Sequence, residues 1–175
     1  VLWGHDFGSN SIGNEGVALD FDSQGNLLWT GYYGGTIDFD PSPSIANHTA
    51  PAGRDIFFAK YSPSGAYLWL KTISGSASNE FVVNIHTTAT DEIFLTGTEN
   101  NQIDFDPSAN TATIFDIYGN TGGTYLAKYT SNGDFLWVKR YGQVPNTCVV
   151  NDSYLDKTTG LIYLSGFFQN VMDAD

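Results

Sequence analysis

Positive charge is scarce in this chain. Its 175 residues include seven Lys plus Arg against nineteen Asp plus Glu, a formal net charge of -12. Nucleic acids and anionic membranes are bound through basic side chains that neutralise phosphate. We therefore expect no nucleic-acid partner and no anionic membrane partner. The acidic balance favours solubility and leaves divalent cations or a cationic partner as the ligands to consider.

Cysteine and long apolar runs are also scarce. Cys148 is the single cysteine, so no internal disulfide can form, and its neighbours Val149 and Val150 favour a small buried strand residue over a nucleophile. No apolar run approaches the ~18 residues of a membrane-spanning helix, which predicts no membrane insertion. The chain opens without Met and without a basic and then apolar leader, so we expect a part of a longer protein or a processed product.

Glycine and aromatic residues, in contrast, are abundant, with nineteen glycines and 15% Phe, Trp and Tyr. Runs such as DIFFAKY (55–61) and AYLWLKT (66–72) have the length and the aromatic and aliphatic content of strands. In the joining turns, Gly65 and Gly133 can take the positive φ of a hairpin. No segment keeps a 3.6-residue apolar period, so we expect almost no helix.

The sequence repeats internally. IDFDPS at 37–42 returns at 103–108, and DIFFAKYSPSGAYLWLK (55–71) matches GTYLAKYTSNGDFLWVK (123–139). A third, truncated copy, GLIYLSGFFQNVMDAD at 160–175, matches GNLLWTGYYGGTIDFD at 25–40. Self-similarity at a fixed period indicates stacked supersecondary units, each too small to bury its own apolar face.

Each full copy is predicted to contain four antiparallel strands, which is the composition of a β-propeller blade. The predicted strands are 16–21, 26–33, 55–61 and 66–73, then 80–86, 92–97, 123–129 and 134–141, with one more at 1–7 and two after 146. The predicted fold class is all-β, a β-propeller segment with about two full blades and parts of a third. The single segment 1–175 is divided into the last strand of a preceding blade (1–7), two blades (16–73 and 79–141) and the first half of a further blade (146–175). The loops 38–54 and 104–122 are expected to be irregular.

The pattern GNLLWTGYYGGTIDFDP…DIFFAKYSPSGAYLWLK resembles the bacterial β-propeller repeat often called SBBP. The resemblance covers nearly the whole chain and is specific for fold rather than function. It implies a large, secreted or surface-attached bacterial protein, similar to cargo of the Bacteroidota type IX secretion route, and therefore an extracellular or cell-surface location. The second copy departs from the pattern in TATDEIFLTG (88–97), where Asp91 replaces the turn glycine.

A propeller closes with about 4–8 blades, so two blades and part of a third leave open sheet edges. We expect those edges to be covered by the rest of the same propeller or by a larger complex. Either a longer chain or several copies around a ring would provide that cover.

The acids of the repeated DFD motif are the candidate site. Because side chains alternate along a strand, Asp38 and Asp40 should share one face, and Asp104 and Asp106 likewise. The third copy, VMDAD (171–175), keeps both acids. Two interpretations stay open. The carboxylates hold the loop by accepting backbone N–H bonds, or they are hard oxygen ligands for calcium, although no EF-hand-like run is present.

Other polar and aromatic positions are given structural roles. Lys60 and Lys128 repeat and are expected to pair with Asp residues of the same or the next blade. Trp69 and Trp137 are expected to pack between blades. Asp20 and Asp22 precede a glycine turn and are interpreted as a hairpin tip. The histidines lack metal-ligand spacing, and no catalytic or cofactor-binding residue is assigned.

The leading hypothesis is a non-catalytic extracellular β-propeller module that binds or scaffolds protein or glycan. One alternative is a propeller enzyme that acts on glycans with catalytic residues outside this segment. The other is a cargo or structural subunit of a secretion or surface assembly. The function depends on the sites, because one fold supports many activities.

Overall fold

A computed structural model describes residues 3–5, 7, 13–75, 81–99, 102–114, 123–142 and 148–168, and all regular structure in these ranges is β-strand. The first blade contains β1 (Glu15–Phe21), β2 (Leu27–Asp38), β3 (Asn47–Tyr61) and β4 (Tyr67–Gly75). The second contains β5 (Phe81–Thr87), β6 (Ile93–Glu99), β9 (Gly123–Tyr129) and β10 (Phe135–Tyr141), with two short strands, β7 (Ile103–Asp104) and β8 (Thr113–Ile114), in its long connection. The last pair is β11 (Cys148–Leu155) and β12 (Ile162–Phe168).

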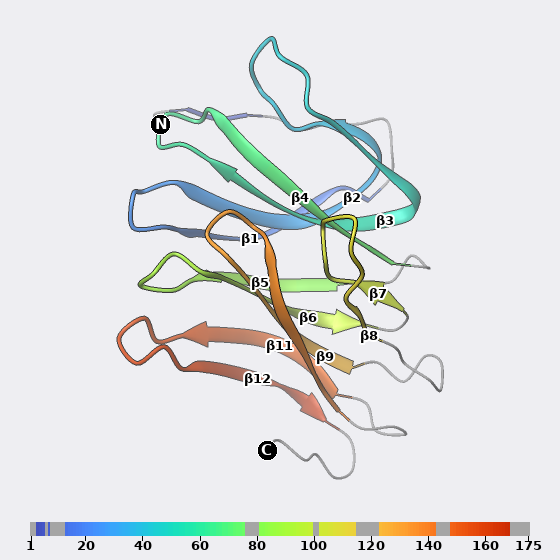
Figure 1. Ribbon diagram of the computed structural model, residues 1–175, viewed down its shortest axis with the longest axis vertical. Helices are drawn as coiled ribbons and strands as arrows, with labels where there is room; N and C mark the ends of the chain where they lie inside the picture. The colour runs from blue at the N-terminus through green and yellow to red at the C-terminus, as the bar shows by residue number, and fades with distance from the viewer. Residues whose placement is uncertain are drawn as a thin grey trace.

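The strands form three antiparallel units that we call blade 1 (β1–β4), blade 2 (β5, β6, β9 and β10) and blade 3 (β11 and β12). They follow one another from top to bottom in Figure 1, with the tight hairpin turns on the left. Blade 2 has the order β10-β9-β6-β5, and blade 1 has the order β1-β2-β3-β4, extended by β7 and β8. The predicted all-β fold of four-stranded antiparallel units is confirmed. In the described ranges, no helix is long and apolar enough to cross a membrane.

Two segments expected to be irregular contain strand. Residues 34–38 of β2 pair with residues 47–54 of β3, so much of 38–54 is an extension of the β2–β3 hairpin, which we call the arm (residues 34–54). The strand continues because Ile37 is buried on the face of blade 1. In blade 2, β7 pairs with β8, while residues 115–122 lie outside the described residues.

The predicted strand at 1–7 is described only in part. Trp3, Gly4, His5 and Phe7 belong to no strand, and the other three residues lie outside the described ones. Phe7 nevertheless packs against blade 1, with its ring 5.3 Å from that of Trp29 and 5.7 Å from that of Tyr61. The Trp3 indole N–H donates to the Pro63 carbonyl at 3.0 Å. This segment therefore lies against the outer face of blade 1, where a preceding blade would pack.

The tight hairpin turns of blades 1 and 2 share one hydrogen-bonded design. A side-chain oxygen on the first residue accepts the N–H of the residue four positions later, in the pairs Asp22–Asn26, Ser62–Ala66, Thr88–Glu92 and Thr130–Asp134. The residue before the last one has a positive φ, namely Gly25, Gly65, Asp91 and Gly133. Asp91 has φ 62°, which agrees with its expected role in place of glycine.

Aromatic layers fill the space between blades. Between blades 1 and 2, Phe58 and Ile73 pack with Tyr125 and Tyr129, and the Phe58 and Tyr129 rings are 4.7 Å apart. Trp69 packs against this layer. Trp137 packs with Phe94 in the layer between blades 2 and 3. The expected packing of both tryptophans between blades is confirmed.

In each blade the first two strands lie so close together that one position on the second strand must be glycine. A Cβ on Gly97 would collide with the carbonyl oxygen of Phe81, and one on Gly31 with that of Glu15. Gly166 meets Val149 in the same way in blade 3. Because the obstacle is backbone, side-chain rotation offers no relief. These glycines therefore mark equivalent positions in β2, β6 and β12.

Candidate functional site

The DFD acids of blade 1 hold the tip of the arm. Asp38 Oδ1 accepts the N–H of Asp40 at 3.0 Å and that of Ala46 at 2.8 Å, so it joins the two ends of the loop. Asp40 Oδ1 accepts the N–H of Ser42 at 2.9 Å. Each carboxylate therefore acts as an acceptor for backbone donors that have no strand partner.

Blade 2 repeats these contacts atom for atom. Asp104 Oδ1 accepts the N–H of Asp106 at 3.1 Å and that of Ala112 at 2.8 Å. Asp106 Oδ1 accepts the N–H of Ser108 at 2.9 Å. We call each of these loops, residues 38–46 and 104–112, an Asp cap. The loop-holding interpretation of the motif agrees with the geometry in both copies.

The apolar residues of the motif face the opposite way from the acids. Phe39 and Phe105 are 1% and 0% exposed. The hydroxyl of Tyr61 donates to the Phe39 carbonyl at 2.9 Å, and that of Tyr129 to the Phe105 carbonyl at 3.0 Å. Burial and the neighbouring Tyr67 raise the pKa of Tyr61, so its hydroxyl stays a donor across the neutral range. The Asp caps are thus attached to the blade by a buried ring and by a tyrosine.

The calcium interpretation of Asp38, Asp40, Asp104 and Asp106 stays a prediction. The structure places each pair in its own Asp cap, with one carboxylate oxygen of each acid engaged by backbone N–H groups. Within the described ranges, no group of three or more His, Cys, Asp or Glu side chains is arranged to hold a metal ion. The third copy of the motif, at 171–175, lies outside the described residues.

The two Asp caps differ in their surroundings. In blade 2, Ile103 and Asp104 also pair with Gly75 and Ser74 at the end of β4, so this cap is joined to blade 1. Next to this junction, the Ser74 hydroxyl donates to Asp55 at 3.0 Å. Burial raises the pKa of Asp55, and the bond from Ser74 opposes that shift.

Both repeated lysines form ion pairs within their own blades, Lys60 with an Asp as expected and Lys128 with a Glu instead. Lys60 Nζ lies 2.7 Å from Asp22 Oδ2, and Lys128 Nζ lies 2.9 Å from Glu92 Oε2. The first pair is the more buried, with side chains 11% and 1% exposed against 20% and 35% for the second. Burial raises the pKa of Asp22, but Lys60 and the bonds from Asn26 outweigh it, and the pKa lies below its ordinary value.

A polar network between blades was not anticipated from the sequence. Asp20 Oδ2 accepts the N–H of Thr87 at 2.7 Å and pairs with Lys157 at 3.2 Å, so one carboxylate joins all three blades. Asp91 accepts the N–H and the hydroxyl of Ser23 at 2.8 and 2.7 Å. The hairpin-tip interpretation holds for Asp22, whereas Asp20 points to the neighbouring blades. Asp20 has no acidic counterpart in the other copies. This difference between the copies was the signal in the sequence from which a role outside its own hairpin could have been predicted.

Comparison with known proteins supports the repeat architecture. No family model matches the chain. A curated relative, the "Uncharacterized WD repeat-containing protein L264" of Acanthamoeba polyphaga mimivirus, is 28% identical over 113 residues. The alignment covers 55% of this chain and 8% of the relative's length. This likeness and the antiparallel sheets agree on a β-propeller-like repeat.

Proposed function

We propose that the chain is a non-catalytic β-propeller module that binds a protein or a glycan through the end of the molecule formed by the arm. The observation that carries this proposal is the Asp cap, which fixes an exposed loop by internal hydrogen bonds at both ends. Loops that are held by a rigid scaffold are where binding surfaces are usually found. The arm lies at the top of Figure 1, away from blades 2 and 3.

An exposed apolar side chain marks the tip of the arm. Ile45 is 74% exposed and directly precedes Ala46, whose N–H is held by Asp38. An aliphatic side chain on a fixed backbone loses little conformational entropy on binding, and this favours an anchoring role. The net charge of -12 favours a neutral or cationic partner.

We also propose an extracellular or cell-surface location in a bacterium. The support is the resemblance of the repeat to secreted SBBP-type propellers and the acidic composition. On the same resemblance, the protein would be a cargo of type IX secretion. Fractionation of a bacterium that expresses the natural gene tests this, and a purely cytoplasmic protein would contradict it.

The binding function is tested with the chain immobilised on a sensor surface. Glycan arrays and a panel of bacterial surface proteins are the ligands, and Ile45→Ser is compared with Leu68→Ser, a control at an exposed position on β4. We expect a ligand whose affinity falls at least tenfold in Ile45→Ser and is unchanged in the control. A ligand bound equally by both variants, or glycan turnover by the chain itself, would contradict the proposal.

Calcium binding is tested separately by thermal unfolding with calcium and with EDTA. If the Asp caps bind the ion, calcium raises Tm in the natural chain but not in Asp38→Asn/Asp40→Asn or Asp104→Asn/Asp106→Asn. Asparagine keeps an oxygen acceptor for the loop and removes the charge that the ion needs. A transition that is the same in both buffers would leave only the loop-holding role.

A further inference from the structure

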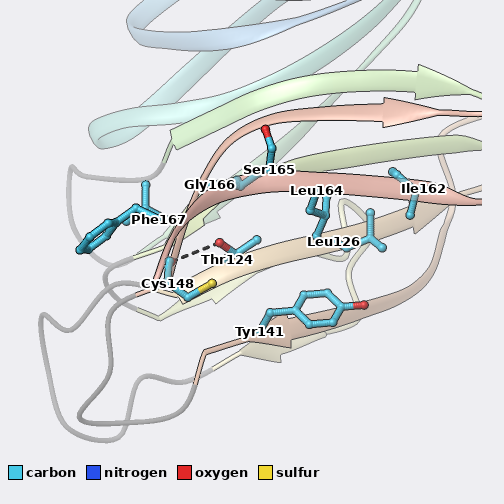
Figure 2. Close-up of a pocket in the computed structure, with 11 residues that line it drawn as sticks. Thr124, Leu126, Tyr141, Cys148, Ile162, Leu164, Ser165, Gly166 and Phe167 are labelled. Carbon is cyan, nitrogen blue, oxygen red and sulfur yellow. Dashed lines mark hydrogen bonds between the residues drawn. The ribbon is translucent and has the colours of Figure 1, made fainter. Parts of the chain in front are cut away.

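A cavity of about 540 Å³ lies between blade 2 and β12, lined by Leu126 and Tyr141 of blade 2 and by Ile162 and Leu164 of β12 (Figure 2). In blade 2, β9 occupies the equivalent place beside β6. The cavity is therefore where the repeat places a third strand, and we assign it no ligand. A ligand site is better sought at the junction of blades 1 and 2, whose four strands are all described.

Arg54, the last residue of the arm, differs from the other basic side chains. All seven Lys and Arg residues lie in the described ranges. Five of them form ion pairs with carboxylates, namely Lys60, Lys71, Lys128, Arg140 and Lys157. Arg54 forms no ion pair and no hydrogen bond with the described part of the chain, although acids outnumber bases nineteen to seven. Its guanidinium therefore offers hydrogen-bond donors to a ligand.

Two aromatic rings hold the guanidinium of Arg54 in place. Its Cζ lies 4.7 Å from the ring centre of Tyr32 and 5.9 Å from that of Phe81. The two rings are perpendicular, with their centres 6.2 Å apart. Tyr32 is buried, whereas Phe81 is 36% exposed and presents part of its ring to solvent. An arginine that is stacked on rings keeps its planar set of donors ordered, so less entropy is lost when an acceptor binds.

A fixed carboxylate lies next to these rings. The Tyr32 hydroxyl donates to Glu15 Oε2 at 2.8 Å. Burial and Glu15 raise the pKa of Tyr32 while Arg54 opposes the shift, so the hydroxyl stays a donor at neutral pH. Glu15 is exposed, and its other oxygen, Oε1, accepts no hydrogen bond from the described residues. Tyr32 thus positions an acceptor at the hydroxyl end of the same ring over which Arg54 holds its donors.

These four residues form a group that the repeat does not contain elsewhere. We call Glu15, Tyr32, Arg54 and Phe81 the arm-base cluster. Strand pairing and the repeat offset give its equivalents at the junction of blades 2 and 3, which are Phe81, Thr98, Gly122 and Val149. What blades share is needed to build the repeat, and this cluster is not shared. A specific site is expected at such a position.

We propose that the arm-base cluster binds a neutral sugar unit of a glycan. The C–H face of the sugar packs on Phe81, and neighbouring hydroxyl groups accept from Arg54 and donate to Glu15 Oε1. A hydroxyl group both donates and accepts, so one sugar satisfies the guanidinium and the carboxylate together. An anionic ligand is disfavoured by Glu15 and by the net charge of -12. The inference rests on the proposed function, because it selects a glycan and places it at the base of the arm.

A glycan array probed with the full 175-residue chain tests the proposal. Oligomers of glucose, galactose, mannose and N-acetylglucosamine are the neutral probes, and oligogalacturonate is the acidic probe. We expect at least one neutral oligomer to bind, with an affinity by calorimetry that falls at least tenfold in Arg54→Met. Lys139→Met is the matched control, because it removes the same charge from a lysine whose Nζ lies 5.5 Å from the Trp137 ring centre. The control should bind like the natural chain.

Two milder variants keep the proposal testable if Arg54→Met does not fold. Arg54→Lys keeps the charge without the planar donors, and Glu15→Gln removes the charged acceptor, so each should weaken binding several-fold. No binding of any neutral oligomer, a preference for oligogalacturonate, or equal affinities in the Arg54 and Lys139 variants would overturn the proposal.

Comparison with Ile45→Ser distinguishes the base of the arm from its tip. A neutral glycan whose affinity depends on Ile45 and not on Arg54 would overturn this inference and leave the proposed function intact. A neutral glycan whose affinity depends on Arg54 and not on Ile45 would support the inference and contradict binding at the tip.

Discussion

Blades 1 and 2 are built from the same repeat, and they differ in where the long connection between their second and third strands leads. In blade 1 the connection is a continuous hairpin, the arm, and its Asp cap stands at the tip. In blade 2 the strands are short, and the Asp cap is joined to β4 of blade 1. The hydrogen bonds inside the two caps are the same. The cap is therefore an independent local unit that can end a free arm or fasten two blades together.

The ion pairs of the two blades differ in a similar way. Lys60 reaches Asp22, the first residue of its hairpin turn, and the pair is almost enclosed. Lys128 reaches Glu92, the last residue of the equivalent turn, and the pair is partly exposed. Lys60 and Lys128 occupy matched positions, but we expect their ion pairs to contribute differently to the free energy of unfolding. Substitutions at matched positions in the two blades separate what is common to the repeat from what depends on context.

The largest effect is expected from the feature that both blades share. Gly31→Ala and Gly97→Ala should each lower the free energy of unfolding by about 3 kcal/mol or more, because the new Cβ meets a backbone carbonyl and the strands must separate. Gly4→Ala is the control, since nothing lies within 4 Å of its Cβ position. Urea unfolding measures the change. Natural stability in either strand variant would contradict the close approach of the strands.

The next effect separates the two ion pairs. Lys60→Met should cost about 3 kcal/mol, because it leaves the buried carboxylate of Asp22 without its counter-ion. Lys128→Met should cost less than about 1 kcal/mol, since Glu92 is partly solvated. Chemical unfolding of both variants at pH 7 gives the comparison. Equal losses would show that burial does not distinguish the pairs.

The contribution of the Lys60–Asp22 pair to stability should depend on pH, and this dependence checks the interpretation of the Lys60→Met result. The pKa of Asp22 is lower in the folded protein than the value of about 3.9 in an unfolded chain. The contribution of the pair is therefore complete above the unfolded-state pKa and is lost as the pH falls through the folded-state pKa. The difference between the natural chain and Asp22→Asn should shrink on acidification. A difference that stays constant down to pH 2 would contradict the lowered pKa.

The two Asp caps are expected to differ less in their contribution to the free energy of unfolding. Asp104→Ala removes the acceptor of two backbone N–H groups in a cap that also holds β7 against β4, and we expect a loss of about 2 kcal/mol. Asp38→Ala removes the same bonds on a free arm and should cost about 1 kcal/mol. Thermal and urea unfolding rank the two variants. A larger loss for Asp38 would mean that the arm stabilises blade 1 more than the junction does.

The sequence predicted what depends on local pattern and repetition. The strands, the turn at Asp91, the opposite faces of Asp38 and Phe39, and the pairing of Lys60 all follow from alternation and turn chemistry. Residues 38–54 are expected to be irregular because they are in excess of the length that a four-stranded blade needs, whereas the burial of Ile37 extends the strand into this segment. The role of Asp20 and the pairing of β7 with β4 depend on residues of other blades, which local periodicity does not place.

The smallest effect concerns the residue that replaces the turn glycine. Asp91 has φ 62° and accepts two hydrogen bonds from Ser23, so the strain of its backbone is offset by a contact to blade 1. Asp91→Ala and Asp91→Gly both lose that contact, but only glycine relieves the strain. We therefore expect Asp91→Gly to be more stable than Asp91→Ala by about 1 kcal/mol.

Blade 1 allows the reverse experiment on the same turn. Gly25 has φ 77°, and a Cβ there would make only an ordinary contact with Pro63 at 3.8 Å. Gly25→Ala should therefore cost about 1 kcal/mol through backbone conformation alone. Urea unfolding of the three variants measures both differences. Asp91→Ala and Asp91→Gly could prove equally stable while Gly25→Ala is destabilised. That result would show that the two turns do not share one backbone conformation and that blades 1 and 2 are not equivalent at this residue.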